Sequence, residues 1–195
     1  MFHNTHCTNS IQTEGVPNLY KVSEDLYRSG QPTAEGMRRL ETMGIRTVVN
    51  LRSFYSDFSK IGGTGLGYER IRFKTWHPEE RQIIKFLHIV TDHRKTPVLV
   101  HCQHGADRTG TMCAVYRIAM QGWTKEDALK EMTEGGFGFH GICDNLIQWI
   151  DKLDIDKIKK AGIRQNPEPV VAPANIYVEL VRRAEKKSRC IFAWD

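Results

Sequence analysis

The sequence predicts an α/β domain with a central, mostly parallel sheet flanked by helices and a helical C-terminal part. Three observations lead to this class. Short apolar segments, typical of buried strands, alternate with longer segments of helical periodicity. The length of 195 residues suits one domain. The contents of 40% hydrophobic and 26% charged residues are those of an ordinary globular protein.

Four segments are predicted to be strands because they are short, apolar or alternating, and bounded by turns. They are residues 26–29, 46–51, 68–73 and 97–101. We expect the first at an edge of the sheet, and the last is apolar enough to be central. The glycine-rich residues 62–67 precede a strand rather than a helix, so we interpret them as a connector and not as a nucleotide-binding loop.

Six segments show helical periodicity or capping signals. They are residues 34–43, 78–93, 109–120, 124–134, 146–153 and 176–184. Thr33 can cap the first helix and Gly44 follows its end, while Pro78 suits the first position of the second. Ligands of parallel sheets bind at the carboxyl ends of the strands. Residues 52–57, 74–80 and 102–108 should therefore share one rim.

The composition argues against several classes of function. The net charge of +5 favours an anionic ligand without indicating nucleic acid, because the basic residues are scattered. The five cysteines include no close pair, so neither a disulfide framework nor a zinc ribbon is predicted. No stretch approaches the roughly 18 apolar residues of a membrane span. We expect a monomer without cofactor or metal, cytoplasmic as the sequence stands, or periplasmic or secreted if a signal peptide was removed.

The segment 101–110, HCQHGADRTG, predicts a phosphate-binding loop that carries its own nucleophile. A strand ends in Cys102, and five residues later Arg108 begins a helix, so backbone N–H groups can turn inward around a tetrahedral oxyanion. Gly105 relieves the tight curl, and Arg108 offers a bidentate fork to phosphate oxygens. The helix N-terminus and the guanidinium both favour the thiolate form of Cys102. A three-ligand metal site in this loop would consume the nucleophile and lack a fourth partner.

This segment resembles the HCxxGxxR[ST]G signature of protein tyrosine and dual-specificity phosphatases. Flanking segments such as LYRS at 26–29 and GGFG at 135–138 are similar to small bacterial dual-specificity-like members. The resemblance spans about residues 19–155 as the phosphatase catalytic domain. It leaves an N-terminal extension, 1–18, and a helical extension packed on the domain, 156–195.

The resemblance implies a two-step mechanism through a cysteinyl-phosphate and no metal. It implies that His101 orders the loop and that Thr109 assists departure of the thiolate. The residues expected to bind substrate are Gln103, His104, Gly105, Ala106, Asp107 and Arg52.

The general acid is not evident, because the family usually supplies an Asp in a region where this chain has KTWHPEE at 74–80. Glu80 and Glu79 are the first candidates, although both would also suit the first turn of a helix. Asp57 on the other rim loop and His77 are further candidates.

Phosphotyrosine or phosphoserine/threonine in proteins is the expected substrate class, because the loop lacks lysines. An inositol phosphate or another small phosphomonoester is the alternative, since several basic side chains can gather on the rim. They are Arg52, Lys60, Arg70, Arg72 and Lys74. A phosphate-binding module without turnover and a sulfur- or arsenate-transferring enzyme remain as other classes.

Overall fold

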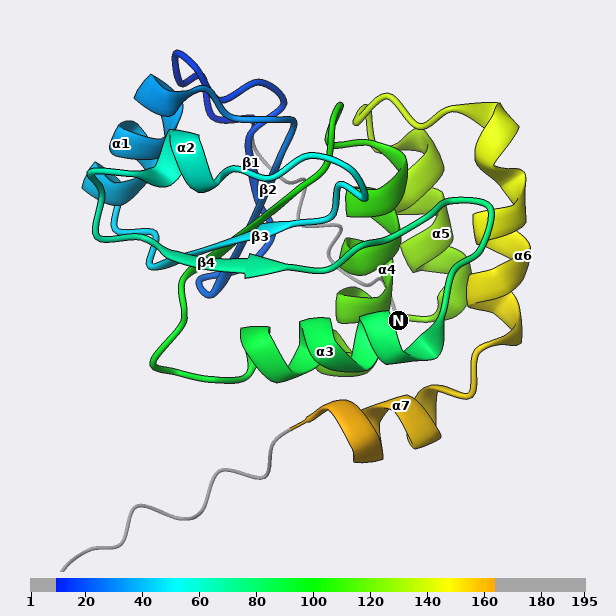
Figure 1. The fold of residues 1–195 in the computed structure, drawn as a ribbon. Helices are drawn as coiled ribbons and strands as arrows, with labels where there is room; N and C mark the ends of the chain where they lie inside the picture. The colour runs from blue at the N-terminus through cyan, green and yellow to red at the C-terminus, as the bar shows by residue number, and fades with distance from the viewer. Residues whose placement is uncertain (1–9, 164–195) are drawn as a thin grey trace, which may run out of the picture. The chain divides into compact units, whose positions relative to one another are not determined.

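The computed structural model describes residues 10–163, which form a five-stranded sheet flanked by helices (Figure 1). The strand order is β1-β2-β5-β3-β4. The strands are β1 Tyr20–Lys21, β2 Leu26–Ser29, β3 Thr47–Asn50, β4 Gly67–Arg70 and β5 Val98–His101. All neighbouring strands run parallel except β1 and β2. The predicted α/β class with a mostly parallel sheet is confirmed.

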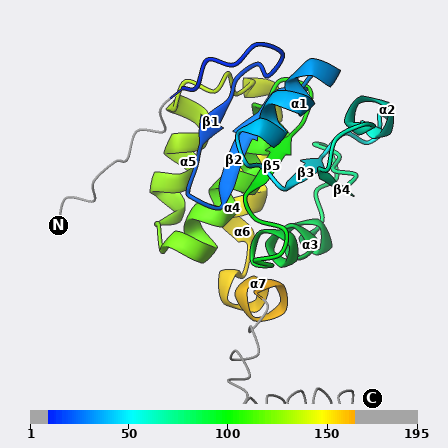
Figure 2. The ribbon, with the colours of Figure 1, turned by 90° about the vertical axis from the view of Figure 1, so that its left-hand side faces the viewer.

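The helices are α1 Ala34–Thr42, α2 Phe58–Ile61, α3 Glu80–Val90, α4 Asp107–Gln121, α5 Lys125–Glu134, α6 Asp144–Lys152 and α7 Ile155–Gly162, with a 3₁₀ turn, η1, over Gly141–Cys143. Helix α1 lies on one face of the sheet and α3 and α4 lie on the other, while α5, α6 and α7 pack on α3 and α4 (Figures 1 and 2). None of the helices between residues 10 and 163 has the length and apolarity needed to cross a membrane. The predicted helix 176–184 lies outside the described residues.

Local sequence accounts for most of the helix ends. Thr33 and Thr124 each cap a helix by accepting a hydrogen bond from the backbone N–H three residues later, at 3.0 Å in both cases. Gly122 ends α4 in the left-handed conformation at φ 71°. Pro78 was expected to open α3, but Glu79 is the capping residue and its N–H donates to Gln82 Oε1 at 3.0 Å.

Strand β5 lies in the middle of the sheet, and its side chains alternate between two apolar clusters. Val98 and Val100 belong to the cluster under α3 to α7, whereas Leu99 belongs to the cluster under α1. All three are fully buried, and each such burial stabilises the fold by roughly 1.5–3 kcal/mol. β2 was expected at an edge, but β1 pairs with it on one side and β5 on the other. The two-residue β1 was too short to show a pattern in the sequence.

The register of the sheet brings three segments of the chain to one rim. Ser29 at the end of β2 and Asn50 at the end of β3 both lie opposite His101 at the end of β5. The N–H of Leu51 donates to the His101 carbonyl at 2.9 Å, and this bond extends the pairing past the strands. The segments after these three strands therefore surround the turn that follows His101.

Candidate active site

The turn after β5 is held by three consecutive carbonyl groups, those of residues 103, 104 and 105. Their donors, in that order, are the backbone N–H of Gln31 at 3.0 Å, Asn18 Nδ2 at 2.9 Å and Arg28 Nη2 at 2.8 Å. In a trans peptide the carbonyl and the next N–H point in opposite directions. The N–H groups of residues 104, 105 and 106 therefore face away from these donors, toward the inside of the turn. This arrangement is a cradle for an oxyanion.

Gly105 is essential to this curl. Its φ of 78° is left-handed, and a Cβ built on it would lie 2.6 Å from the backbone of Ser29 and Gly30. The N–H of Gly105 donates to Cys102 Sγ at 3.3 Å, which places the thiol at the base of the cradle. Cys102 is only 2% exposed, so a substrate reaches it through the cradle rather than from the side.

Two residues at the start of α4 are available to a ligand. Arg108 lines the pocket above the cradle, and its guanidinium forms no hydrogen bond or ion pair within residues 10–163. The hydroxyl of Thr109 is buried and has no hydrogen-bond partner among the described residues. A buried polar group normally has a partner, so both side chains suit groups that engage when a ligand is bound.

Behind the cradle, His101 and Asp57 form a buried pair. His101 Nε2 lies 2.8 Å from Asp57 Oδ2, and His101 Nδ1 lies 3.1 Å from the Cys102 carbonyl. Asp57 also accepts from Gln31 Nε2 and Asn50 Nδ2, each at 2.7 Å. Burial alone would raise the pKa of Asp57, but the hydrogen bond and charge of His101, with the Gln31 amide, lower it by more. Asp57 is therefore an ionised anchor for His101.

This position is inconsistent with Asp57 as a proton donor. Its side chain is 1% exposed and lies behind the cradle rather than in the pocket. A donor must be protonated before it acts and must reach the leaving group. The sequence placed Asp57 correctly on a rim loop, but the direction of its side chain depends on Gln31 and His101, which are distant in the chain.

A pocket of about 620 Å³ opens above the cradle. Four residues of the loop and the start of α4 line it, namely Gln103, His104, Asp107 and Arg108, whereas Gly105 and Ala106 do not. Its walls include Arg52, Tyr55, Trp76 and His140. Tyr55 and Trp76 are 61% and 69% exposed, so large rings surround the entrance. Arg52 donates to Gln31 Oε1 at 2.8 Å and stacks on the Tyr55 ring at 4.0 Å, which links this wall to the loop anchor.

Neither glutamate proposed as the acid lines this pocket. Glu79 lines a neighbouring pocket and is paired with Arg81, whose hydrogen bond lowers the pKa of Glu79. Glu80 accepts from Lys157 Nζ at 2.7 Å on the opposite side of the N-terminus of α3. Each glutamate is therefore paired with a basic side chain, and both place negative charge in or next to the first turn of α3, where it is favourable.

Two residues at the site were missed by sequence reasoning. Asn18 and Arg28 hold the loop carbonyls from outside. His140 reaches the pocket from the loop after α5. Arg28 is 1% exposed and stacks on Phe137 at 3.7 Å. The segments of Arg28 and Phe137 were noted for their resemblance to the family, but no local pattern assigned either a contact.

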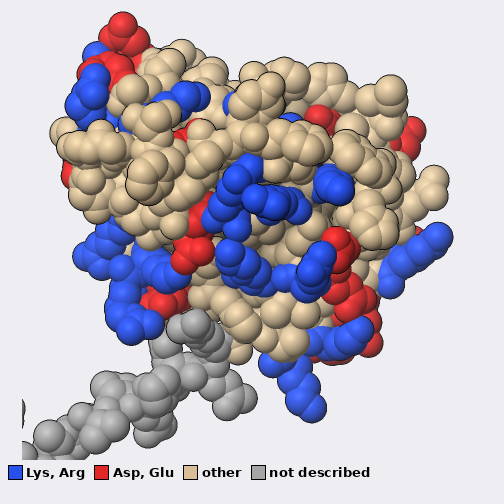
Figure 3. Space-filling model, viewed as in Figure 1, with Lys and Arg blue, Asp and Glu red and all other residues tan. Residues whose placement is uncertain are grey.

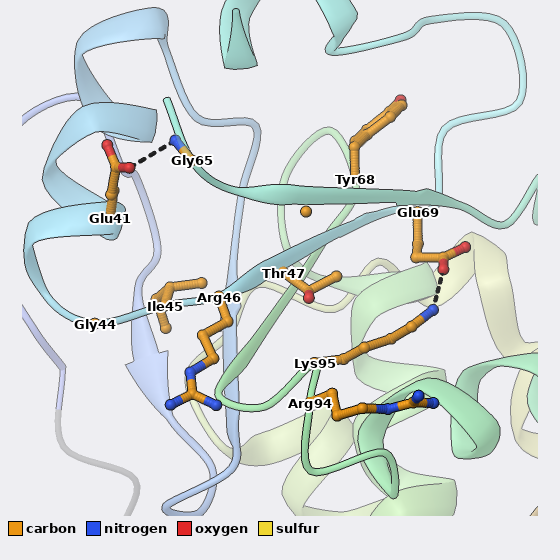
Figure 4. A pocket seen from close by; sticks show the side chains of 11 residues that line it. Glu41, Gly44, Ile45, Arg46, Thr47, Gly65, Tyr68, Glu69, Arg94 and Lys95 are labelled. Carbon is orange, nitrogen blue, oxygen red and sulfur yellow. Dashed lines mark hydrogen bonds and ion pairs between the residues drawn. The ribbon is translucent and has the colours of Figure 1, made fainter. Parts of the chain in front are cut away.

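Another pocket, of about 840 Å³, lies at the opposite rim of the sheet (Figure 4). It is lined by residues at the amino ends of β3 and β4, including Thr47 and Gly67. Its carboxylates already have partners, since Glu41 accepts from the Gly65 N–H at 2.6 Å and Glu69 pairs with Lys95. It lies at the other end of the sheet from Cys102, so its size does not make it part of the site around the cradle.

The match to a family model decides the classification. The model described as "DSP-PTPase phosphatase fused to NAD+ Kinase" matches residues 9–147. The chain belongs to this phosphatase family. The family match covers the cradle, Arg108 and the loop that carries His140, and it confirms the resemblance to small dual-specificity-like phosphatases.

Individual relatives agree with this family. The dual specificity protein phosphatase TpbA of Pseudomonas aeruginosa is 33% identical over 147 residues, which are 74% of this chain and 66% of TpbA. The chain thus spans slightly less than two thirds of that relative. Inositol diphosphatase DSP5 of Arabidopsis thaliana is 30% identical over 128 residues, 59% of this chain and 60% of DSP5. The crystal structure of P. aeruginosa TpbA covers 83% of this chain and 100% of its own, with TM-score 0.72 and 29% identity.

Proposed function

We propose that this protein hydrolyses phosphomonoesters through a cysteinyl-phosphate formed on Cys102. One observation carries the proposal: three backbone N–H groups face the inside of a turn whose base holds the thiol and whose rim holds the guanidinium of Arg108, which has no partner between residues 10 and 163. An oxyanion with three equatorial oxygens fits these donors. Family membership supports the same reading.

The mechanism follows from the positions of these groups. The thiolate of Cys102 attacks phosphorus, and the P–O bond to the leaving group breaks as the S–P bond forms. The cradle and Arg108 hold the equatorial oxygens, where charge is greatest in the transition state. Water then attacks phosphorus, and the thiolate departs. The buried Thr109 hydroxyl, which has no hydrogen-bond partner in the described part of the chain, would donate to that sulfur.

We take phosphotyrosine and phosphoserine/threonine in proteins as the leading substrate class. The exposed rings of Tyr55 and Trp76, with Phe54 at 78% exposure, offer apolar surface for a peptide around the pocket. The dual-specificity name of TpbA supports the same class, as does a crystal structure of a TpbA variant in complex with pTyr.

A second candidate is a small substrate with several phosphates, such as an inositol phosphate. A pocket of about 500 Å³ shares Ser53 and Phe54 with the pocket above the cradle. Its basic residue types are Arg70, Arg72, Lys74, His77 and Arg81. Figure 3 shows Lys and Arg side chains gathered near the middle of one face of the molecule. Relatives named inositol diphosphatases make this candidate worth testing.

The test compares wild type with Cys102→Ser and Arg108→Ala on 4-nitrophenyl phosphate. Both variants should lose turnover, whereas Cys113→Ser, a buried cysteine of α4 that does not line the pocket, should retain it. Full activity of Cys102→Ser would refute the proposal. Binding of phosphopeptide by the wild type without turnover would identify a recognition module instead.

Rates on phosphopeptides and on inositol hexakisphosphate then rank the two substrate classes. Arg72→Glu together with Lys74→Glu should reduce turnover of the inositol phosphate much more than that of a phosphopeptide with one phosphate. An equal reduction for both substrates would remove the support that the basic pocket gives to the second class.

A further inference from the structure

A phosphatase of this kind needs a proton for its leaving group, and the structure narrows the possible donors. Among the described residues, the ionisable side chains that line the pocket above the cradle are Arg52, Tyr55, His104, Asp107, Arg108, His140 and Cys143. The two arginines stay protonated. Burial raises the pKa of the Cys143 thiol, so it remains neutral and is a weak acid. Asp107 and the two histidines are the groups to compare.

His140 is held in a defined orientation by Asp107. Its Nδ1 lies 2.9 Å from Asp107 Oδ2, and its backbone N–H donates to Asp107 Oδ1 at 2.8 Å. A carboxylate accepts hydrogen bonds, so Nδ1 carries the proton of this bond and Nε2 is left for the pocket. His104 lies nearby, with ring centroids 5.4 Å apart, but its side chain has no hydrogen-bond partner within residues 10–163.

We propose that His140, oriented by Asp107, is the general acid that protonates the leaving group and the base that then activates water. The inference rests on the proposed phosphatase function. A carboxylate bound to Nδ1 of an imidazole fixes the tautomer and stabilises the protonated ring, as in hydrolases that pair Asp with His. The His140 side chain is 49% exposed, so solvent can supply protons to it.

The proton balance closes over the two steps. In the first, Cys102 Sγ bonds to phosphorus, the P–O bond to the leaving group breaks, and that oxygen takes the proton from His140 Nε2. The alcohol or phenol departs neutral. In the second step a water oxygen bonds to phosphorus, the S–P bond breaks, and His140 Nε2 takes a proton from the water. The cycle returns the thiolate, the protonated imidazole and inorganic phosphate.

The surrounding charges are compatible with this role. Asp107 and Arg108 line the pocket with His140 from the start of α4, His104 from the cradle and Cys143 from η1. Arg52 and Tyr55 line the far wall. The carboxylate of Asp107 directly contacts the ring, and Arg108 lines the same pocket.

The experiment compares His140→Gln with wild type on a good leaving group, 4-nitrophenyl phosphate, and a poor one, phenyl phosphate. Loss of a general acid typically costs about 10²–10⁴-fold, so we expect kcat/KM for phenyl phosphate to fall by about 100-fold or more and that for 4-nitrophenyl phosphate much less. The alkaline limb of the wild-type profile on phenyl phosphate should disappear. If His140 also activates water in the second step, His140→Gln should release a burst of nitrophenol followed by a slower steady state.

Asp107→Asn should produce the same pattern more weakly, and His93→Gln provides the control. His93 is exposed in the turn before β5, at the other end of the strand from Cys102. Equal losses on both substrates, an unchanged alkaline limb, or a larger leaving-group effect from Asp107→Asn than from His140→Gln would overturn the assignment. If wild type hydrolyses neither ester, the phosphatase proposal itself fails, which is a separate outcome.

Discussion

Asp57→Asn tests whether the buried pair behind the cradle supports the nucleophile. The Asp57 carboxylate accepts from Gln31, Asn50 and His101. An asparagine amide has one acceptor oxygen, so its NH₂ group must face a donor. Gln31 cannot turn its amide to compensate without losing the bond from Arg52 to its Oε1. Leaving a buried polar group unsatisfied costs about 1–3 kcal/mol, and more beside a charge, so we expect a loss of about 3 kcal/mol in the free energy of unfolding.

The effect of pH on stability has a definite sign. The folded-state pKa of Asp57 lies below its ordinary value of 3.8. Its contribution is therefore complete above about pH 4 and is lost as pH falls through the folded pKa. Urea unfolding at pH 7 should show the full difference between wild type and Asp57→Asn. The same comparison near pH 3 should show a smaller one.

The exposed Asp25→Asn is the matched control, because its carboxylate forms no hydrogen bond in the described part of the chain. A surface change of this kind should alter stability by less than about 0.5 kcal/mol. The reasoning fails if Asp57→Asn is within about 1 kcal/mol of wild type at pH 7, a change too small for a broken buried pair. It also fails if the difference grows as the pH is lowered.

Two further substitutions test the cradle itself. Gly105→Ala should lower the free energy of unfolding, measured in urea, by about 3 kcal/mol or more. The left-handed backbone costs about 1–2 kcal/mol, and the new Cβ meets the backbone of Ser29 at 2.6 Å. A variant as stable as wild type would contradict the left-handed conformation and close packing described for Gly105. Arg28→Lys loses the planar stack on Phe137 and weakens a charged hydrogen bond to the Gly105 carbonyl. It should raise the vanadate inhibition constant by about 10-fold, equivalent to about 1.4 kcal/mol. An unchanged constant would show that Arg28 does not support oxyanion binding by the cradle.

The sequence was sufficient to predict the loop because its functional residues are consecutive. Cys102, Gly105 and Arg108 lie within seven positions, so spacing alone indicates a turn between a strand and a helix. The helix and strand segments were predictable for the same reason, since periodicity is local. The four-residue α2 gave too short a pattern, and the interior place of β2 depends on pairing with β1 and β5.

The supports of the loop were not predictable, because they come from distant segments. Asn18 and Arg28 precede the loop by 86 and 77 positions in their contacts with residues 104 and 105. His140 follows its partner Asp107 by 33 positions. For the proton donor, the sequence drew attention to Glu79 and Glu80, whose charges also suit the first turn of α3. In the sequence alone, a glutamate that only stabilises the start of a helix cannot be distinguished from one that donates a proton.

The central place of β5 also bears on how the protein would lose activity. A strand bonded on both sides cannot open without separating its neighbours, so its amides should exchange with solvent only when the whole domain unfolds. The cradle is attached to the end of that strand and to the segments that follow β2 and β3. Heating should therefore abolish turnover and tertiary structure in a single transition, with no inactive but folded state preceding it.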